Sequence, residues 1–88
     1  MKIIVSNPFI KDTKALPVHV HKAIAKVVEE LKTATTLFDV NSCSKLQGTK
    51  DMYRIRFGDY RMTLTLLITK DTVTLLRVLP RGQVYKKR

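Results

Sequence analysis

Six arginines, all in the second half of the chain, are the side chains best suited to chemistry. They are Arg54, Arg56, Arg61, Arg77, Arg81 and Arg88. A guanidinium group presents a planar fork of N–H donors that binds phosphate bidentately and stacks on bases, which lysine cannot do. Because three of these arginines are crowded between residues 54 and 61, the pattern indicates a surface for a polyanion, nucleic acid above all.

The distribution of charge favours the same interpretation. The chain carries 17 Lys and Arg against 7 Asp and Glu, a net charge of +10. Residues 1–40 hold six basic and four acidic side chains, whereas residues 41–88 hold eleven basic and three acidic ones. A solvated basic surface without a ligand is the alternative. Binding to a membrane is disfavoured, because the basic residues do not follow a helix with a strong apolar face.

Several classes of protein are disfavoured by the sequence. Cys43 is the single cysteine and cannot form an intramolecular disulfide, and the spacing of His and Cys does not match a metal site, so we expect neither metal nor cofactor. The apolar run at residues 1–5 is too short for a signal peptide or a membrane span, which favours the cytoplasm. With 88 residues, we expect one domain spanning residues 1–88.

Two helices are predicted in the first half, after a short strand at residues 2–5. Ser6 is an N-cap candidate with proline two positions later, which favours a helix over residues 8–15. A second helix begins around Pro17 and ends among the β-branched residues at 33–36. Its apolar residues recur at helical spacing and form one stripe, which consists of Val20, Ile24, Val27, Val28 and Leu31.

The second half reads as a loop at residues 37–50 followed by strands. Branched and aromatic residues fill three runs, 52–57, 60–69 and 72–79. Gly58-Asp59 and Lys70-Asp71 are short enough to be tight hairpin turns. The element order is therefore β-α-α-β-β-β, an α+β fold in which an antiparallel sheet carries both helices on one face.

A two-residue turn at Gly58-Asp59 sets the register of the first hairpin. It places Arg56 opposite Arg61, and directly paired residues share a face of the sheet. The face toward the helices then carries Tyr53, Ile55, Phe57, Tyr60, Met62, Leu64, Leu66 and Ile68. The opposite face carries Arg54, Arg56, Arg61, Thr63 and Thr65, and we expect it to face solvent. The alternative is the ordinary polar alternation of a half-buried strand, but no acidic residue interrupts this face.

The last strand has two possible registers. If Lys70-Asp71 is a two-residue turn, Val73 and Leu75 point into the core and Arg77 follows them inward. A longer turn or a β-bulge instead turns Leu76 and Val78 inward and Arg77 outward. Both halves of the strand are apolar enough to be buried, which favours a bulge and leaves the side of Arg77 open.

Five short motifs resemble the RelE family of the RelE/ParE superfamily, which are toxins of type II toxin–antitoxin systems. In order, they are Lys45-Leu46-Gln47-Gly48, Tyr53-Arg54-Ile55-Arg56, Gly58-Asp59-Tyr60-Arg61, Leu76-Arg77-Val78 and Arg81-Gly82-Gln83-Val84-Tyr85. The resemblance implies the β-α-α-β-β-β fold and a metal-free endonuclease that cuts mRNA in the ribosomal A site. In that reaction the ribose 2′-OH attacks the adjacent phosphate.

The resemblance also implies site residues and partners. By position, the expected catalytic residues are Arg54, Arg56, Arg61, Arg81 and Tyr85. The expected RNA-binding residues are Lys45, Lys50, Lys86 and again Arg54, Arg56 and Arg61. Arg61 matches the arginine that grips phosphate, and Tyr85 matches a stacking or proton-transfer group. The implied partners are an acidic antitoxin, the ribosome and mRNA.

Two positions depart from the family pattern. Leu64 and Pro80 stand where many members carry Tyr and His, so we expect the site to lack two polar groups and to depend on Tyr85. Two alternatives therefore stay open. One is a ParE-like toxin that inhibits DNA gyrase, and the other is a RelE homologue that binds RNA or antitoxin without cleaving.

Overall fold

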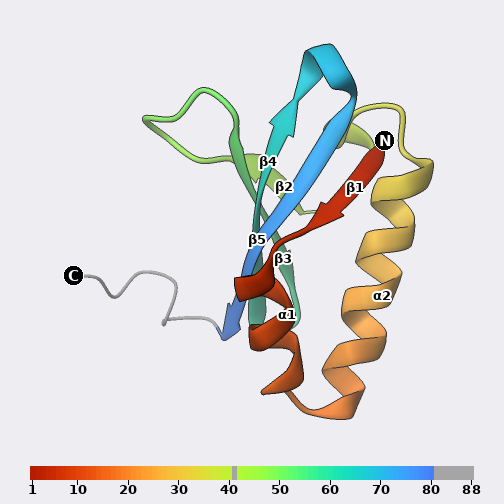
Figure 1. The fold of residues 1–88 in the computed structure, drawn as a ribbon, viewed down its shortest axis with the longest axis vertical. Coiled ribbons are helices and arrows are strands. Elements are labelled where there is room, and N and C mark those ends of the chain that lie inside the picture. Colours follow the sequence, from red (N-terminus) through yellow and green to blue (C-terminus); the bar gives the residue numbers. More distant parts are fainter. Residues whose placement is uncertain (41, 81–88) are drawn as a thin grey trace.

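A five-stranded sheet forms the centre of the molecule, and one long helix lies across one of its faces (Figure 1). The structure is a computed structural model that describes residues 1–40 and 42–80. In chain order its elements are β1 (Lys2–Val5), α1 (Asn7–Lys14), α2 (Val18–Thr33), β2 (Cys43–Lys45), β3 (Met52–Phe57), β4 (Tyr60–Leu67) and β5 (Thr72–Pro80). No helix in the described part of the chain is long and apolar enough to cross a bilayer.

The strand order is β1-β5-β4-β3-β2. β1 runs parallel to β5, and the remaining neighbours are antiparallel. The predicted α+β class is confirmed, with two additions. The sheet is mixed and not wholly antiparallel as predicted, because β1 pairs with β5 in parallel. β2 lies within the expected loop at 37–50, and its three residues are too few to show a strand pattern in the sequence.

The two helices begin and end close to the predicted residues. Ser6 caps α1, since its Oγ accepts a hydrogen bond from the backbone N–H of Phe9 at 3.3 Å. Pro17 is the N-cap residue of α2, which ends at Thr33. The predicted apolar stripe is buried against the sheet at Val20, Ile24, Val27 and Leu31, and Val28 is partly buried.

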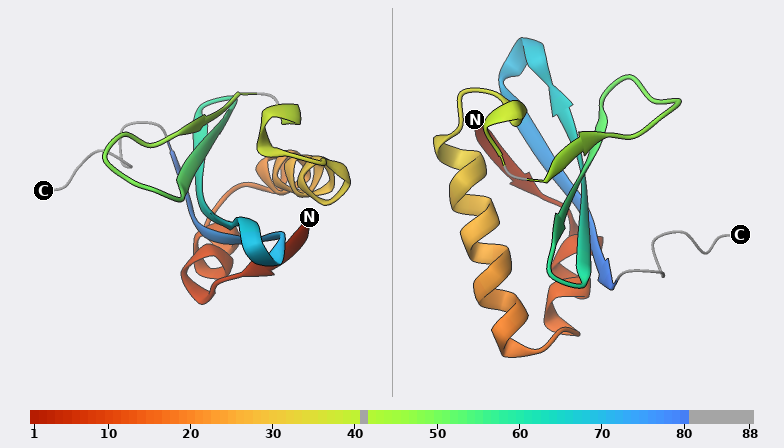
Figure 2. Two further views of the ribbon diagram at one scale, coloured as in Figure 1. Left: turned by 90° about the horizontal axis from the view of Figure 1, so that it is seen from above. Right: turned by 180° about the vertical axis from the view of Figure 1, so that it is seen from behind.

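α1 has a different position from α2. It follows the end of β1 and packs along β5, as the views in Figures 1 and 2 show. Its Phe9 side chain is buried in the same core that α2 covers. α1 therefore packs against the part of β5 that follows Leu75, where β1 no longer pairs with it.

The hairpin of β3 and β4 has the predicted register. Phe57 pairs with Tyr60 and Arg56 pairs with Arg61. Gly58 has a φ of 58°, whereas Asp59 is not among the residues with positive φ, as in a type II′ turn. The core face is also confirmed for most of its length, since Ile55, Met62 and Leu64 are fully buried.

The connection from β4 to β5 is longer than predicted. β4 ends at Leu67, which pairs with Thr72, and the four residues between them include a 3-10 turn and Asp71 at a φ of 49°. The expected tight turn at Lys70-Asp71 is therefore wrong. Ile68 was expected in the core, but it lies in this connection and is 78% exposed.

The predicted β-bulge in β5 is present, but Leu76, which was expected to turn inward with Val78, is only partly buried. Thr63 pairs with Arg77 and Leu64 pairs with Leu75, so Leu76 is the extra residue. The bulge lets both apolar halves of the strand face the core, because Leu75 and Val78 are fully buried on either side of it. Arg77 consequently lies on the opposite, open face.

Candidate nucleic-acid interface

Four arginines lie on the open face of the sheet. Arg54 and Arg77 flank Thr63 in one row, and Arg56 pairs with Arg61 in the next. Directly paired residues project on the same side, so the register alone brings these four side chains onto one surface. We call this surface, with Arg54, Arg56, Arg61 and Arg77, the arginine face.

Arg56 and Arg61 line a hollow of about 220 Å³ together with Ser42, Gly58 and Tyr60. Arg56 is exposed, but Arg61 is only 6% exposed. The prediction that all three hairpin arginines face solvent is therefore wrong for Arg61. Arg61 lies on β4, the middle strand, and its partners in the ladder are Arg56 on one side and Leu79 on the other.

A charged group in this position is well suited to hold an anion. A guanidinium stays protonated at physiological pH and has five N–H donors. Partial burial lowers the effective dielectric constant around it, which strengthens its attraction for a phosphate oxygen. The hollow beside Arg56 and Arg61 can therefore act as a phosphate-binding site.

Arg54 continues the arginine face toward β2. Its Nε donates a hydrogen bond to Ser44 Oγ at 3.3 Å, and Ser44 is its strand partner. Arg54 also lines a second hollow, of about 440 Å³, with Ser44 and Lys45. The structure thus brings Lys45 close to Arg54. Lys50 is exposed in the loop after β2 and lines neither hollow.

The remaining expected site residues belong to the C-terminal end of the chain. Arg81, Tyr85 and Lys86 lie outside the described residues, which end at Pro80. β5 carries the chain to Pro80, which pairs with Tyr60 beside the first hollow. The roles of these three residues stay predictions.

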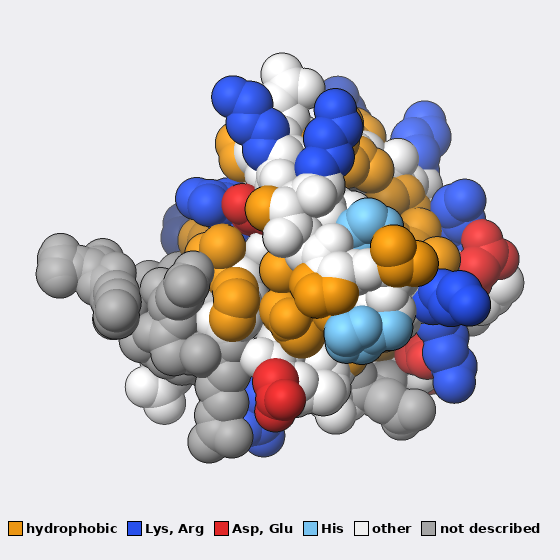
Figure 3. Space-filling model, turned by 90° about the horizontal axis from the view of Figure 1, so that it is seen from below, with side chains coloured by type: hydrophobic (Ala, Val, Ile, Leu, Met, Phe, Trp, Pro, Cys, Tyr) orange, Lys and Arg blue, Asp and Glu red, His pale blue; other side chains and the backbone are white. Residues whose placement is uncertain are grey.

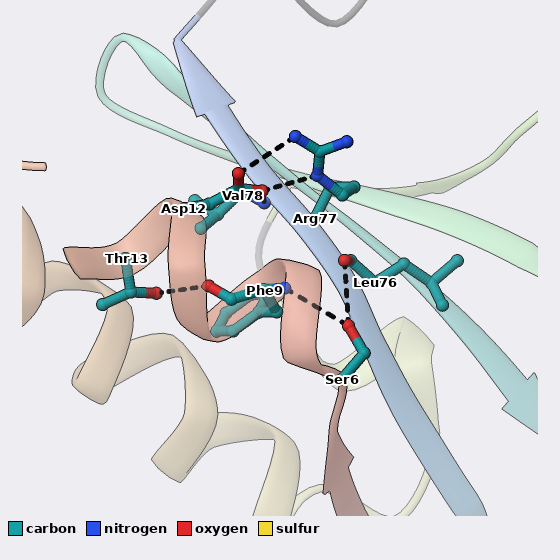
Figure 4. Close-up of polar contacts among 7 residues, drawn as sticks. All are labelled: Ser6, Phe9, Asp12, Thr13, Leu76, Arg77 and Val78. Atoms are coloured by element: carbon teal, nitrogen blue, oxygen red, sulfur yellow. Dashed lines mark hydrogen bonds and ion pairs between the residues drawn. The ribbon is translucent and has the colours of Figure 1, made fainter. Parts of the chain in front are cut away.

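Arg77 is held by a carboxylate from α1 (Figure 4). Its Nε and Nη2 donate hydrogen bonds to Asp12 Oδ2 at 2.7 Å and to Asp12 Oδ1 at 3.0 Å. The hydrogen bond with Asp12 raises the pKa of Arg77 further above its usual value. The same carboxylate oxygen Oδ2 accepts the backbone N–H of Val78 at 3.1 Å. Sequence patterns give no sign of this contact, because the partners are 65 residues apart.

Leu64 does not belong to the arginine face. Its side chain is fully buried in the core, and it pairs with Leu75 and Tyr53. A tyrosine at this position would point between the sheet and α2. The expectation that Leu64 removes a polar group from the site is therefore wrong for this chain.

Ser42 and Tyr60 also line the hollow beside Arg56 and Arg61, and the sequence did not predict either of them there. Ser42 has a φ of 60°, and its carbonyl oxygen accepts the backbone N–H of Arg56 at 3.2 Å. A serine gives no signal for this left-handed conformation, which glycine or asparagine would have suggested. Tyr60 could be read as a core residue only, yet it lines the hollow at the end of the hairpin.

A third hollow, on the other side of the β3–β4 hairpin end, is largely apolar. Tyr60 and Gly58 also line this hollow, of about 280 Å³, with Phe57, His19 and Ala23. Seen from this end, the hydrophobic side chains gather beside the two histidines, and many of the Lys and Arg side chains lie farther out (Figure 3). The hairpin end therefore separates an arginine-lined hollow from a largely apolar one.

A family model described as "ParE toxin of type II toxin-antitoxin system, parDE" matches residues 3–85. The chain is a member of the RelE/ParE superfamily of type II toxins. Toxin RelE3 of Methanocaldococcus jannaschii is 35% identical over 97% of this chain and 96% of its own length. These findings confirm the resemblance that the five motifs indicated.

Solved structures of RelE toxins have the same fold. A chain of the RelB–RelE antitoxin–toxin complex from Methanococcus jannaschii superposes with a TM-score of 0.78 and 32% identity, covering 93% of this toxin and 94% of that chain. A chain of the RelE–RelB complex from Pyrococcus horikoshii OT3 reaches the same TM-score at 24% identity, with 93% and 96% covered. At that identity, the second match supports the fold alone.

Proposed function

We propose that this toxin is a ribosome-dependent mRNA endonuclease that inhibits translation. The observation that carries the proposal is the paired Arg56 and Arg61, which line one hollow on an open sheet face that bears two more arginines. The 35% identity to Toxin RelE3 over almost the whole chain supports the same assignment.

The arginines would act on the phosphate rather than on protons. In metal-free cleavage, the 2′-oxygen forms a bond to phosphorus while the bond to the 5′-oxygen breaks. The 2′-OH loses a proton, and the 5′-oxygen gains one. An arginine side chain is a poor proton acceptor because it already carries its proton, but it stabilises negative charge that develops on the phosphoryl oxygens. Arg61 and Arg56, with Arg54 one row away, fit this role.

Proton transfer would then fall to the C-terminal residues. Tyr85 carries a hydroxyl that can take part in proton transfer, and Arg81 carries a guanidinium that can bind the phosphate. A positioned acid or base accelerates such reactions by about 10² to 10⁴. Replacing the tyrosine hydroxyl should therefore affect the rate of cleavage more than the binding of RNA.

The proposal is tested by incubating the toxin with translating ribosomes and mapping mRNA ends by primer extension. We expect cleavage only when ribosomes are present. Tyr85→Phe should reduce its rate by about 10²-fold or more, because Phe keeps the ring and removes the hydroxyl. Binding of RNA to this variant should be nearly unchanged, which separates loss of chemistry from loss of affinity.

Two results would favour the other interpretations. The family model is described as a ParE toxin, so a DNA gyrase supercoiling assay belongs in the same experiment. Inhibited supercoiling with intact mRNA would indicate a ParE-like toxin. RNA binding without cleavage or gyrase inhibition would indicate a homologue that has lost catalytic activity.

We also propose an acidic antitoxin as the partner of this chain. The net charge of +10 and the arginine face favour an acidic, partly disordered segment that folds on binding. The match to a RelB–RelE complex supports a partner of this kind. We expect the product of a short neighbouring reading frame to copurify with the toxin and to restore growth. Copurification that fails at every salt concentration would contradict this expectation.

A further inference from the structure

In the ion pair of Arg77 with Asp12, the carboxylate is largely buried and the guanidinium is half exposed. The Asp12 side chain is 11% exposed, whereas the Arg77 side chain is 50% exposed. An ion pair with one partner half exposed adds little to stability. Its geometry, by contrast, is well defined, because two parallel N–H donors of Arg77 meet the two oxygens of one carboxylate.

α1 fixes the strand around Arg77 at three points. Asp12 accepts the backbone N–H of Val78 in addition to the guanidinium. At the start of the helix, Ser6 Oγ donates a hydrogen bond to the carbonyl oxygen of Leu76 at 3.0 Å (Figure 4). The backbone N–H of Ser6 donates to the carbonyl oxygen of Leu75 at 3.1 Å. Contacts from Ser6 and α1 therefore hold the bulge that turns Arg77 onto the open face. The contact with Asp12 also fixes the direction of the Arg77 side chain.

The guanidinium group of Arg77 keeps donors for a further ligand. Of the five N–H donors of an arginine, two are directed at Asp12, which leaves three. Thr63 separates Arg77 from Arg54 in one row of the sheet, so these donors belong to the arginine face. A bound carboxylate also fixes the plane of the guanidinium before any ligand arrives, which lowers the entropy lost on binding.

We propose that Arg77 is a fourth phosphate-contacting residue of the arginine face and that Asp12 is the positioning residue that orients it. The inference rests on the proposed RNA-binding function, and the ligand is the phosphodiester backbone of single-stranded RNA. Arg77 would contact a phosphate beyond the one held at Arg56 and Arg61. The RNA strand would thus extend across the sheet toward α1.

A short single-stranded RNA, with fluorescence anisotropy at several salt concentrations, provides the test. Arg77→Ala should weaken binding about threefold to tenfold, because it removes a half-exposed charge-assisted contact. It should also make the salt dependence shallower by about 0.7 in the slope of log K against log salt, as expected for one lost phosphate contact. Lys26→Ala is the matched control. It removes the same charge from the exposed side of α2 and should change neither quantity appreciably.

Asp12→Asn separates positioning from net charge. The variant raises the net charge from +10 to +11, so electrostatic attraction alone predicts tighter binding of RNA. If Asp12 orients Arg77, the variant instead binds about threefold more weakly. Asp59→Asn causes the same change of charge at the exposed hairpin turn and should bind RNA at least as tightly as the unmodified toxin.

Each outcome decides between the proposals. Asp12→Asn with unchanged or tighter binding would overturn the positioning role. If Asp12→Asn does not fold, Arg77→Lys is measured in its place. This variant keeps the positive charge but loses the bidentate contact with Asp12. Unchanged RNA binding by Arg77→Lys would then overturn the positioning role of Asp12. Normal RNA binding by the Arg77 variants together with weak binding by Arg61→Ala would contradict the role of Arg77 but not the proposed RNA-binding function. Normal binding by Arg61→Ala as well would remove the proposed RNA surface itself.

Discussion

Replacing Arg61 with alanine is expected to abolish growth arrest without unfolding the toxin. Arg61 is 6% exposed on the middle strand and shares the 220 Å³ hollow with Arg56. Because a charge-assisted hydrogen bond contributes about 1.5–3 kcal/mol, RNA should bind about tenfold to a hundredfold more weakly. The rate of cleavage should fall by about 10² to 10³, as expected when a donor that stabilises developing charge is removed.

Two further variants show why Arg61 matters. Arg61→Lys keeps the positive charge but loses the planar fork, so we expect activity between that of alanine and that of the unmodified toxin. Lys26→Ala removes one charge from an exposed position on α2 and should remain fully toxic. Thermal unfolding followed by circular dichroism establishes that each variant is folded. A folded Arg61→Ala protein that still arrests growth would contradict the proposed site.

Replacing Leu64 with tyrosine is expected to destabilise the toxin and to leave its activity unimproved. Judged from the sequence, this substitution restores a residue that many family members carry. In the structure, however, Leu64 is fully buried in the core. The larger ring overpacks the core at a cost of about 1–3 kcal/mol, and a buried hydroxyl without a partner costs about 1–3 kcal/mol more. Urea unfolding monitored by circular dichroism measures the loss.

The matched control for Leu64→Tyr is Leu67→Tyr. Leu67 lies on the same strand but on the opposite face, and it is 48% exposed. The same chemical change should therefore alter the free energy of unfolding by less than about 0.5 kcal/mol. A Leu64→Tyr variant that is as stable as the control and cleaves mRNA faster would show that position 64 contributes to the site after all.

Much of the fold followed from local rules of the chain. The apolar stripe of α2, the cap at Ser6 and the strand alternation of β3 and β4 are each set within a few residues. A two-residue turn leaves one register for the hairpin, so the pairing of Arg56 with Arg61 could be derived before the fold was known. The shared face of Arg54, Arg56 and Arg61 is thus a property of the sequence.

Contacts between distant segments decided the rest of the candidate site. Arg61 is buried on β4, which pairs with β3 on one side and with β5 on the other, and neither its burial nor its second neighbour can be read from the pattern of the strand itself. Arg77 faces outward because a bulge at Leu76 lets both apolar halves of β5 reach the core, while Asp12, 65 residues earlier, holds its guanidinium. Local periodicity determines which side chains can share a face of the sheet. Burial and long-range pairing, which depend on the whole packed chain, determine how each of them is held there.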